Sequence, residues 1–126
     1  MKALWIPCII LVTLFFLLYA NSLYLHRLIE PLQEQLEEAG YCVERGDWSA
    51  AQEITAAVHS TWHSHAAYLH VTLRHGDIDS IYILLEEARA YLQTEKRGEY
   101  TAANAALIGQ FGLLYEMEQL SLQNIL

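Results

Sequence analysis

The sequence predicts an all-α protein, with an N-terminal transmembrane helix followed by an antiparallel helical bundle of three to four helices arranged as two helical hairpins. Three observations predict this class. Residues 3–25 contain no charged side chain. The rest of the chain repeats apolar residues at spacings of three, four and seven, as helices do. No segment alternates polar and apolar residues in the manner of a half-buried strand. The chain therefore divides into an anchor at 1–25 and one helical domain at 26–126.

The anchor is long enough to cross a bilayer, because a hydrocarbon core of ~30 Å needs about 20 apolar residues in a helix. Trp5 lies near one end, and Tyr19 and Tyr24 lie near the other, where amphipathic rings favour the membrane interfaces. A cleaved signal peptide requires small residues in an A-x-A-like pattern. The nearest candidate, Leu18-Tyr19-Ala20, has a large residue at the outer position. We therefore expect an uncleaved signal anchor.

Charge indicates where the domain lies and what it binds. Lys2 before the anchor favours a cytoplasmic N-terminus and an extracytoplasmic domain at the cell membrane. All fifteen acidic residues and six of the seven basic residues follow the anchor, which gives this part a formal charge of −9. Phosphate backbones repel such a domain, so we expect no nucleic-acid partner. A protein with a cationic patch, or a cation, is more compatible.

The first helix of the domain is expected at 23–39, where it continues or kinks out of the anchor. Pro31 marks the expected kink, because proline removes a backbone donor. Gly40 is expected to end the helix. The sequence leaves open whether this helix packs in the bundle or extends the anchor as a stalk.

Three further helices are expected at about 47–75, 77–94 and 99–123. Gly76 separates the first two, and Asp77 is expected to cap the second of them. Their inward-facing residues are predicted to be Ala51, Val58, Trp62, Ala66, Leu69 and Leu73, then Ile78, Ile81, Leu84, Leu85, Ala88 and Leu92, then Ala103, Leu107, Phe111, Leu114, Met117 and Leu120.

An eight-residue motif occurs twice in the domain. Residues 45–52 return as residues 97–104, at an offset of 52, with four identical positions. In each copy a glycine ends one segment and an acidic residue opens a helix, where it faces the positive end of the helix dipole. We interpret the repeat as two hairpins of similar design. Convergent chemistry at two helix starts is the alternative.

Several short motifs appear in a fixed order along the chain. They are the N-terminal anchor, Asp47-Trp48 opening a helix, Trp62 within it, the segment His75-Gly76-Asp77-Ile78-Asp79, and the terminal Asn124-Ile125-Leu126. This order resembles the domain of unknown function 4363 family, found in Gram-positive bacteria. The resemblance covers nearly the whole chain and implies a membrane-anchored helical architecture. The family has no established activity, so the resemblance implies no mechanism.

Histidines are concentrated between His59 and His75. His59 and His63 are four residues apart, so they share a helical face and can chelate a divalent metal. His70 shares that face but stands about 10 Å further along the axis, so a third ligand must come from another helix or a partner. A solvated polar edge is the alternative interpretation. His65 points into the apolar stripe, where we expect a hydrogen-bonded core histidine.

The densest polar cluster consists of His75, Asp77 and Asp79. We interpret it as a hydrogen-bond network at a helix junction, with ligand binding as the alternative. The pair His59-x-x-x-His63 lacks the glutamate of a zinc protease, and the sequence has no phosphate-binding glycine loop. We therefore expect no enzymatic activity and no cofactor.

The domain is rich in aromatic residues, which concentrate at protein interfaces when they remain exposed. Trp48, Trp62 and Tyr100 are the predicted interface candidates. We expect a protein-interaction module at the cell surface that binds another membrane or cell-surface protein, with a homo-oligomer also possible and the lipid bilayer contacted through the anchor. The alternative function is a metal- or small-ligand-binding domain that uses the His-rich helix.

Overall fold

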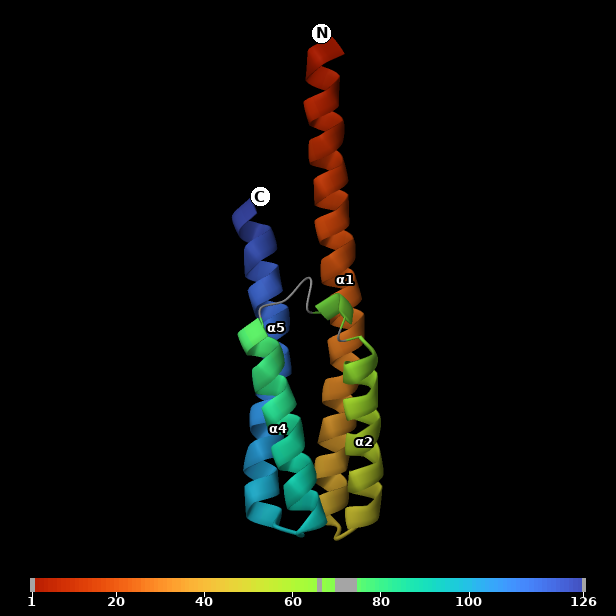
Figure 1. Cartoon of the computed structure of the whole chain (residues 1–126), viewed down its shortest axis with the longest axis vertical. Coiled ribbons are helices and arrows are strands. Elements are labelled where there is room, and N and C mark those ends of the chain that lie inside the picture. Colours follow the sequence, from red (N-terminus) through yellow and green to blue (C-terminus); the bar gives the residue numbers. More distant parts are fainter. Residues whose placement is uncertain (1, 66, 70–74, 126) are drawn as a thin grey trace.

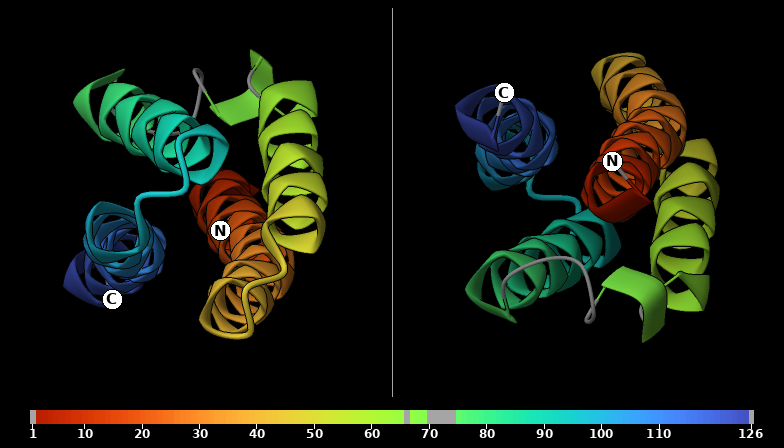
Figure 2. Two further views of the ribbon diagram at one scale, coloured as in Figure 1. Left: turned by 90° about the horizontal axis from the view of Figure 1, so that it is seen from below. Right: turned by 90° about the horizontal axis from the view of Figure 1, so that it is seen from above.

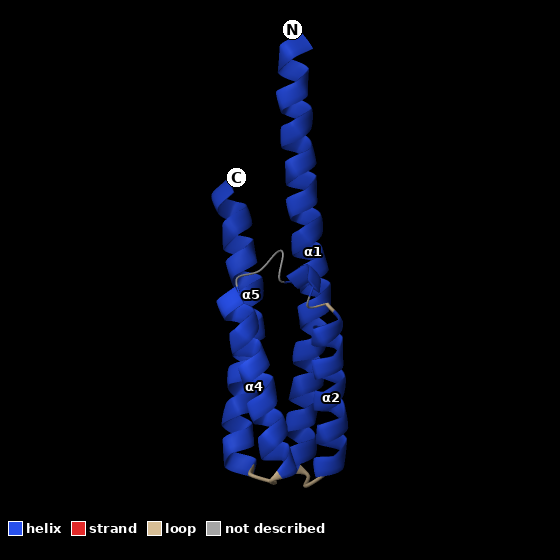
Figure 3. Cartoon of the chain, viewed as in Figure 1, coloured by secondary structure: helices blue, strands red, loops and turns tan. Residues whose placement is uncertain are grey.

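The computed structural model describes residues 2–65, 67–69 and 75–125, and the side chains of residues 2, 75 and 118–125 lie outside this description. Its helices are α1 (Lys2–Glu44), α2 (Trp48–Ser64), α4 (His75–Gln93) and α5 (Arg97–Ile125), and residues 67–69 form one further helical turn. The described residues contain no strand (Figure 3), so the predicted all-α class is confirmed.

The four helices form a closed ring. α1 packs on α2 and α5, and α4 packs on the same two helices. Each helix runs antiparallel to its neighbours, as the views along the bundle show (Figure 2). The N-terminal half of α1 projects alone beyond one end of the bundle, and the turns between paired helices lie at the other end (Figure 1).

α1 is continuous through Pro31 and past Gly40, so the prediction that Gly40 ends the helix is wrong. A Cβ at Gly40 would lie 3.4 Å from Nδ2 of Asn104, an ordinary contact distance, so α5 packs against α1 at this position. The chain turns instead at Gly46, whose φ of +79° is readily adopted only by glycine. Its N–H donates to the carbonyl oxygen of Val43 at 2.9 Å, as at other helix C-termini.

The two halves of α1 have different surroundings. From Leu25 onward its inward residues are buried, so residues 23–39 pack in the bundle and are not a stalk. Before Asn21 almost every side chain is exposed. Among the described helices, α1 is the one long and apolar enough to cross a membrane, with a segment of mean hydropathy 2.4 that no part of the bundle covers. This is consistent with a signal anchor or a signal sequence.

The two hairpins, α1–α2 and α4–α5, share one design at an offset of 49 residues. Gly46 and Glu95 both have positive φ, and their N–H groups donate to Val43 and Leu92, which are also 49 residues apart. The buried positions follow the same offset, which relates the hairpins by a pseudo-twofold axis. They pair Ile29 with Ile78, Leu32 with Ile81, Leu36 with Leu85, Ala39 with Ala88, Val43 with Leu92, Ala51 with Tyr100, Thr55 with Asn104, Val58 with Leu107 and Trp62 with Phe111.

The predicted offset of 52 is therefore wrong by almost one helical turn. Asp47 caps α2, and its carboxylate accepts a hydrogen bond from the Ala50 N–H at 3.2 Å. In the second copy of the motif, Gly98 and Glu99 already belong to the first turn of α5. The same residue types thus precede one helix and begin the other.

The prediction of one helix over 47–75 is also wrong, because α2 ends at Ser64 with His65 as its C-cap. Leu69 is buried in the core as predicted, but residues 66 and 73 of the predicted stripe lie outside the described part. At the equivalent place α5 continues to Ile125. The two hairpins therefore differ in the length of their second helix.

The boundaries of α4 and α5 agree with the predictions to within two residues. The predicted inward residues of α4 are buried, apart from the half-buried Leu84. In α5 the prediction holds through Leu114, while Met117 is exposed and the side chain of Leu120 is outside the described part. Trp62 and Phe111 meet where the hairpins face each other, with ring centroids 5.2 Å apart.

Candidate functional site

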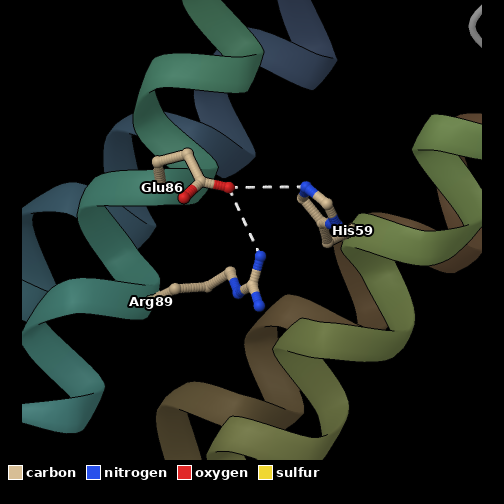
Figure 4. A network of polar contacts seen from close by, with 3 residues as sticks. All are labelled: His59, Glu86 and Arg89. Atoms are coloured by element: carbon tan, nitrogen blue, oxygen red, sulfur yellow. Dashed lines mark hydrogen bonds and ion pairs between the residues drawn. The ribbon is translucent and has the colours of Figure 1, made fainter.

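The predicted histidine pair lies on α2, at the solvent-exposed edge of its packing against α4. The rings of His59 and His63 are stacked, with centroids 6.2 Å apart and planes at 4°. His59 is half-buried, and its Nε2 lies 3.4 Å from Oε1 of Glu86 on α4. The same carboxylate oxygen lies 3.3 Å from Nη1 of Arg89 (Figure 4). Glu86 therefore links the two hairpins through a contact that becomes an ion pair when His59 is protonated.

An exposed apolar pair borders this network. Tyr82 is 53% exposed and Ile83 is 55% exposed, both on α4. The Tyr82 ring lies 6.4 Å from that of His59, so the aromatic and polar groups form one surface across α2 and α4. We call it the α2–α4 face, comprising His59, His63, Tyr82, Ile83, Glu86 and Arg89. It combines an exposed aromatic anchor with charged groups, a combination common in protein interfaces.

The same surface has part of a metal-ligand set. His59 and Glu86 supply an imidazole and a carboxylate from different helices. Glu86 thus lies on another helix, where a third ligand beside His59 and His63 was expected. Arg89 competes for the carboxylate oxygen. Within residues 2–65, 67–69 and 75–125, no group of three or more His, Cys, Asp or Glu side chains is arranged to hold a metal ion.

The polar cluster at the start of α4 differs from its prediction. α4 begins at His75, two residues earlier than expected, so Asp77 lies in the first turn and is not the cap. Asp77 is half-buried and Asp79 is exposed. A carboxylate in the first turn still faces the positive end of the helix dipole, which supports a structural role for Asp77. The side chain of His75 lies outside the described part, so the predicted network has no test here.

Two of the three predicted interface residues are in the core. Trp62 is 4% exposed and Tyr100 is 1% exposed, so neither can contact a partner while the bundle is folded. Trp48 is half-buried at the start of α2. Helical periodicity placed Trp62 in the inward stripe, which is incompatible with its prediction as an interface residue, and the structure agrees with the periodicity. Exposed aromatic surface on the bundle comes instead from residues such as Tyr41 and Tyr82.

His65 is hydrogen-bonded, as predicted, although it is half-buried at the end of α2. Its Nδ1 lies 2.5 Å from the hydroxyl oxygen of Tyr24 on α1. This contact fixes the point where the chain leaves α2 against the helix that leads to the anchor. The sequence distance between the partners, 41 residues, gives no local signal for it.

A buried polar layer between the hairpins was not anticipated from the sequence. Asn104 donates from Nδ2 to the carbonyl oxygen of Leu36 at 3.0 Å, while its Oδ1 has no hydrogen-bond partner. The buried hydroxyls of Thr55 and Tyr100 also lack partners of normal geometry. Burial raises the pKa of Tyr100 to about 12. Buried polar groups of this kind lower the stability of the bundle, but they disfavour alternative packings of the two hairpins even more and so favour a single arrangement.

The anchor carries a shallow groove lined by apolar side chains, including Leu4, Trp5 and Val12. It lies on α1 away from the bundle, where acyl chains would cover it in a bilayer. We therefore place the candidate site on the α2–α4 face and not in this groove.

Comparison with known proteins assigns the chain to a family. The model of the domain of unknown function DUF4363 matches residues 19–125, which include the end of the apolar segment and all of the bundle. No curated protein and no solved structure matches the chain. The match covers most of the sequence, and the chain therefore belongs to the DUF4363 family.

Proposed function

We propose that this is a single-pass membrane protein whose acidic helical bundle binds another membrane or cell-surface protein through the α2–α4 face. The role is binding and not catalysis. The observation that carries the proposal is the exposed pair Tyr82 and Ile83 beside the His59–Glu86–Arg89 network. A folded bundle gains nothing from leaving a tyrosine and an isoleucine in water, whereas an interface gains from both.

The anchor supports the membrane part of the proposal. The apolar half of α1 has no covering helix, so a bilayer is the environment that removes its side chains from water. Lys2 before the anchor favours a cytoplasmic N-terminus and an extracytoplasmic bundle. Tethering also confines the bundle to a thin layer beside the membrane, which raises its effective concentration toward partners in the same bilayer.

The charge of the bundle indicates the chemistry of the partner. Residues after the anchor carry a formal charge of −9, so a partner surface with Lys or Arg side chains is attracted and an acidic one is repelled. On the α2–α4 face, Glu86 lies one helical turn from the apolar pair and carries a carboxylate. We expect the partner to place an aromatic or aliphatic group on Tyr82 and a cation near Glu86.

The test is co-purification of the full-length protein with its partner from native membranes. Tyr82→Ala should weaken the complex by about 2 kcal/mol, or roughly thirtyfold in Kd, if Tyr82 is a central contact. Glu86→Lys should weaken it further because it reverses a charge at the same surface. Tyr41→Ala is the matched control, since Tyr41 is an exposed tyrosine on α1. Equal retention of partners by all variants would contradict the proposed surface.

A divalent metal is the second candidate ligand, because His59 Nε2 and Glu86 Oε1 meet across two helices beside the His63 ring. A metal that binds only the folded state raises stability by about 2.7 kcal/mol at a hundred times its Kd. Zn²⁺ would then raise the Tm of the parent chain but not that of His59→Ala. Unchanged melting of the parent in Zn²⁺ would eliminate this candidate.

A further inference from the structure

α5 remains aligned with α1 as both run toward the anchor. Gln33 on α1 donates from Nε2 to the carbonyl oxygen of Ile108 on α5 at 3.1 Å. The rings of His26 and Tyr115 lie 4.7 Å apart. Both steps, from Gln33 to His26 and from Ile108 to Tyr115, are seven residues long, so the helices advance together.

This alignment places the end of α5 at a definite level along the anchor. Ile125 lies ten residues beyond Tyr115, and Phe16 lies ten residues before His26, so the two are level about 15 Å past the last aromatic contact. Figure 1 shows the end of α5 rising alongside the projecting half of α1.

The structure leaves no spacer between a bilayer and the bundle. Counted from Ala3, about 17 to 20 helical residues fill the hydrocarbon core, which puts its outer edge between Tyr19 and Ser22. Ser22 and Leu25 are already buried by the bundle. Because α5 reaches the level of Phe16, its last turns overlap the outer edge of any bilayer that α1 crosses in this way.

The side chains at this level suit a lipid interface. Met117 on α5 is exposed, and the alignment places it level with Tyr24 on α1, one residue from the exposed Leu23. A headgroup layer is about 5–8 Å thick, which is the rise of four or five helical residues. Glu116 lies one residue closer to water, where an ionised carboxylate avoids the cost of entering the hydrocarbon core.

Tyrosines from three separate segments lie within about one helical turn of this level along the bundle. The rings of Tyr24 on α1 and Tyr68 in the 67–69 turn lie 4.7 Å apart, and the Tyr68 hydroxyl donates to Asn21. Tyr115 on α5 packs against His26. Tyrosine is enriched at membrane interfaces because its ring is apolar and its hydroxyl is polar. Segments distant in sequence thus form one tyrosine belt, comprising Tyr24, Tyr68 and Tyr115.

We propose that the C-terminal turns of α5, from Met117 onward, enter the outer headgroup layer of the bilayer beside α1 and that their end reaches the edge of the hydrocarbon core. The bundle then stands on the membrane on two helices, with the tyrosine belt at the water side of the contact. The inference rests on the proposed anchor and extends it, since an anchor alone does not require a second membrane contact. A zwitterionic lipid is the suitable probe, because an anionic surface repels the acidic bundle.

The test measures the depth of nitroxide labels on the full chain reconstituted in phosphatidylcholine vesicles. Cys8→Ala removes the exposed thiol, while Cys42 is buried and remains. Single cysteines are introduced at exposed positions, Met117→Cys on α5 and Leu23→Cys one residue from the same level on α1. Collision with lipid-soluble oxygen, relative to a water-soluble nickel complex, reports the depth of each label. The parent without an introduced cysteine corrects for labelling of Cys42.

Two further labels separate this proposal from the anchor itself. Phe16→Cys lies within the anchor, and Tyr41→Cys lies in the last turn of α1, at the far end of the bundle from the anchor. We expect the deepest signal at position 16, matching interfacial signals at positions 23 and 117, and a fully aqueous signal at position 41. An immersed label at 16 with an aqueous label at 117 would overturn the proposal but keep the anchor. An aqueous label at 16 would overturn the anchor and the proposal together.

Discussion

Trp62→Ala tests how the two hairpins hold each other. Trp62 is 4% exposed, and its ring meets that of Phe111 edge-to-face at 5.2 Å and 75°. Because the pseudo-twofold axis relates Trp62 to Phe111, their contact lies beside this axis and joins the two hairpins. Replacing a buried tryptophan by alanine costs about 3–5 kcal/mol, a large share of the roughly 5–15 kcal/mol by which a domain is stable. The aromatic contact itself should account for about 0.5–1.5 kcal/mol of this.

The assay is guanidinium unfolding of the full-length protein in detergent micelles, followed by helical circular dichroism. A double-mutant cycle with Phe111→Leu isolates the aromatic contact from the cavity that each truncation leaves. Tyr82→Ala is the control, because an exposed substitution should change the free energy of unfolding by no more than about 0.5 kcal/mol. The packing of the hairpins would be refuted if Trp62→Ala and Tyr82→Ala had equal effects.

Three further predictions concern the turns and the buried layer, and the same unfolding assay measures each. Gly46→Ala should lower the free energy of unfolding by about 1–2 kcal/mol because φ is positive at this residue. Glu95→Gly should raise the free energy of unfolding by up to about 1 kcal/mol for the same reason. Changes of equal sign in the two variants would contradict the shared turn. Asp47→Ala should cost about 0.5–2 kcal/mol through loss of the cap. The pKa of Tyr100 is raised from 10.0 to about 12 by burial, so the folded state keeps a proton that the unfolded state loses. The contribution of Tyr100 is therefore constant below pH 10 and falls by about 1.4 kcal/mol per pH unit between pH 10 and 12. Tyr100→Phe should flatten that decline, and an unchanged decline would exclude Tyr100 as its source.

Periodicity was sufficient for the parts of the fold that depend on local sequence. The stripe from Ile78 to Leu92 is buried as predicted, apart from the half-buried Leu84, because one helical face determines which residues turn inward. The uncharged run at 3–25 is helical throughout, and its residues before Asn21 are almost all exposed. The end of α2 could not be predicted in this way. No glycine or proline stands between Ser49 and His75, so the sequence carries no such local signal at Ser64, where α2 ends.

The candidate site depended on contacts between hairpins, which one sequence does not specify. His59 and His63 were identified from their spacing, but the approach of Glu86 depends on how α4 packs against α2. The buried hydrogen bond of Asn104 could not be predicted from the sequence either. An asparagine in a helix is usually solvated, and this one donates to a carbonyl oxygen 68 residues away. The repeat could be identified from the sequence, but the identical residues recur at an offset of 52, whereas the equivalent backbone turns are 49 residues apart.

The most direct measurement is site-specific photo-crosslinking in cells from position 82 of the full-length protein at native level, followed by mass spectrometry of the adducts. A matched photo-reactive residue replaces Tyr41, which is exposed to a similar extent but lies outside the α2–α4 face. The account predicts a recurrent adduct with one membrane or cell-surface protein from position 82 and none with that protein from position 41. Adducts with that protein from both positions, or no adduct from position 82, would contradict the claim that the α2–α4 face is a protein-binding surface.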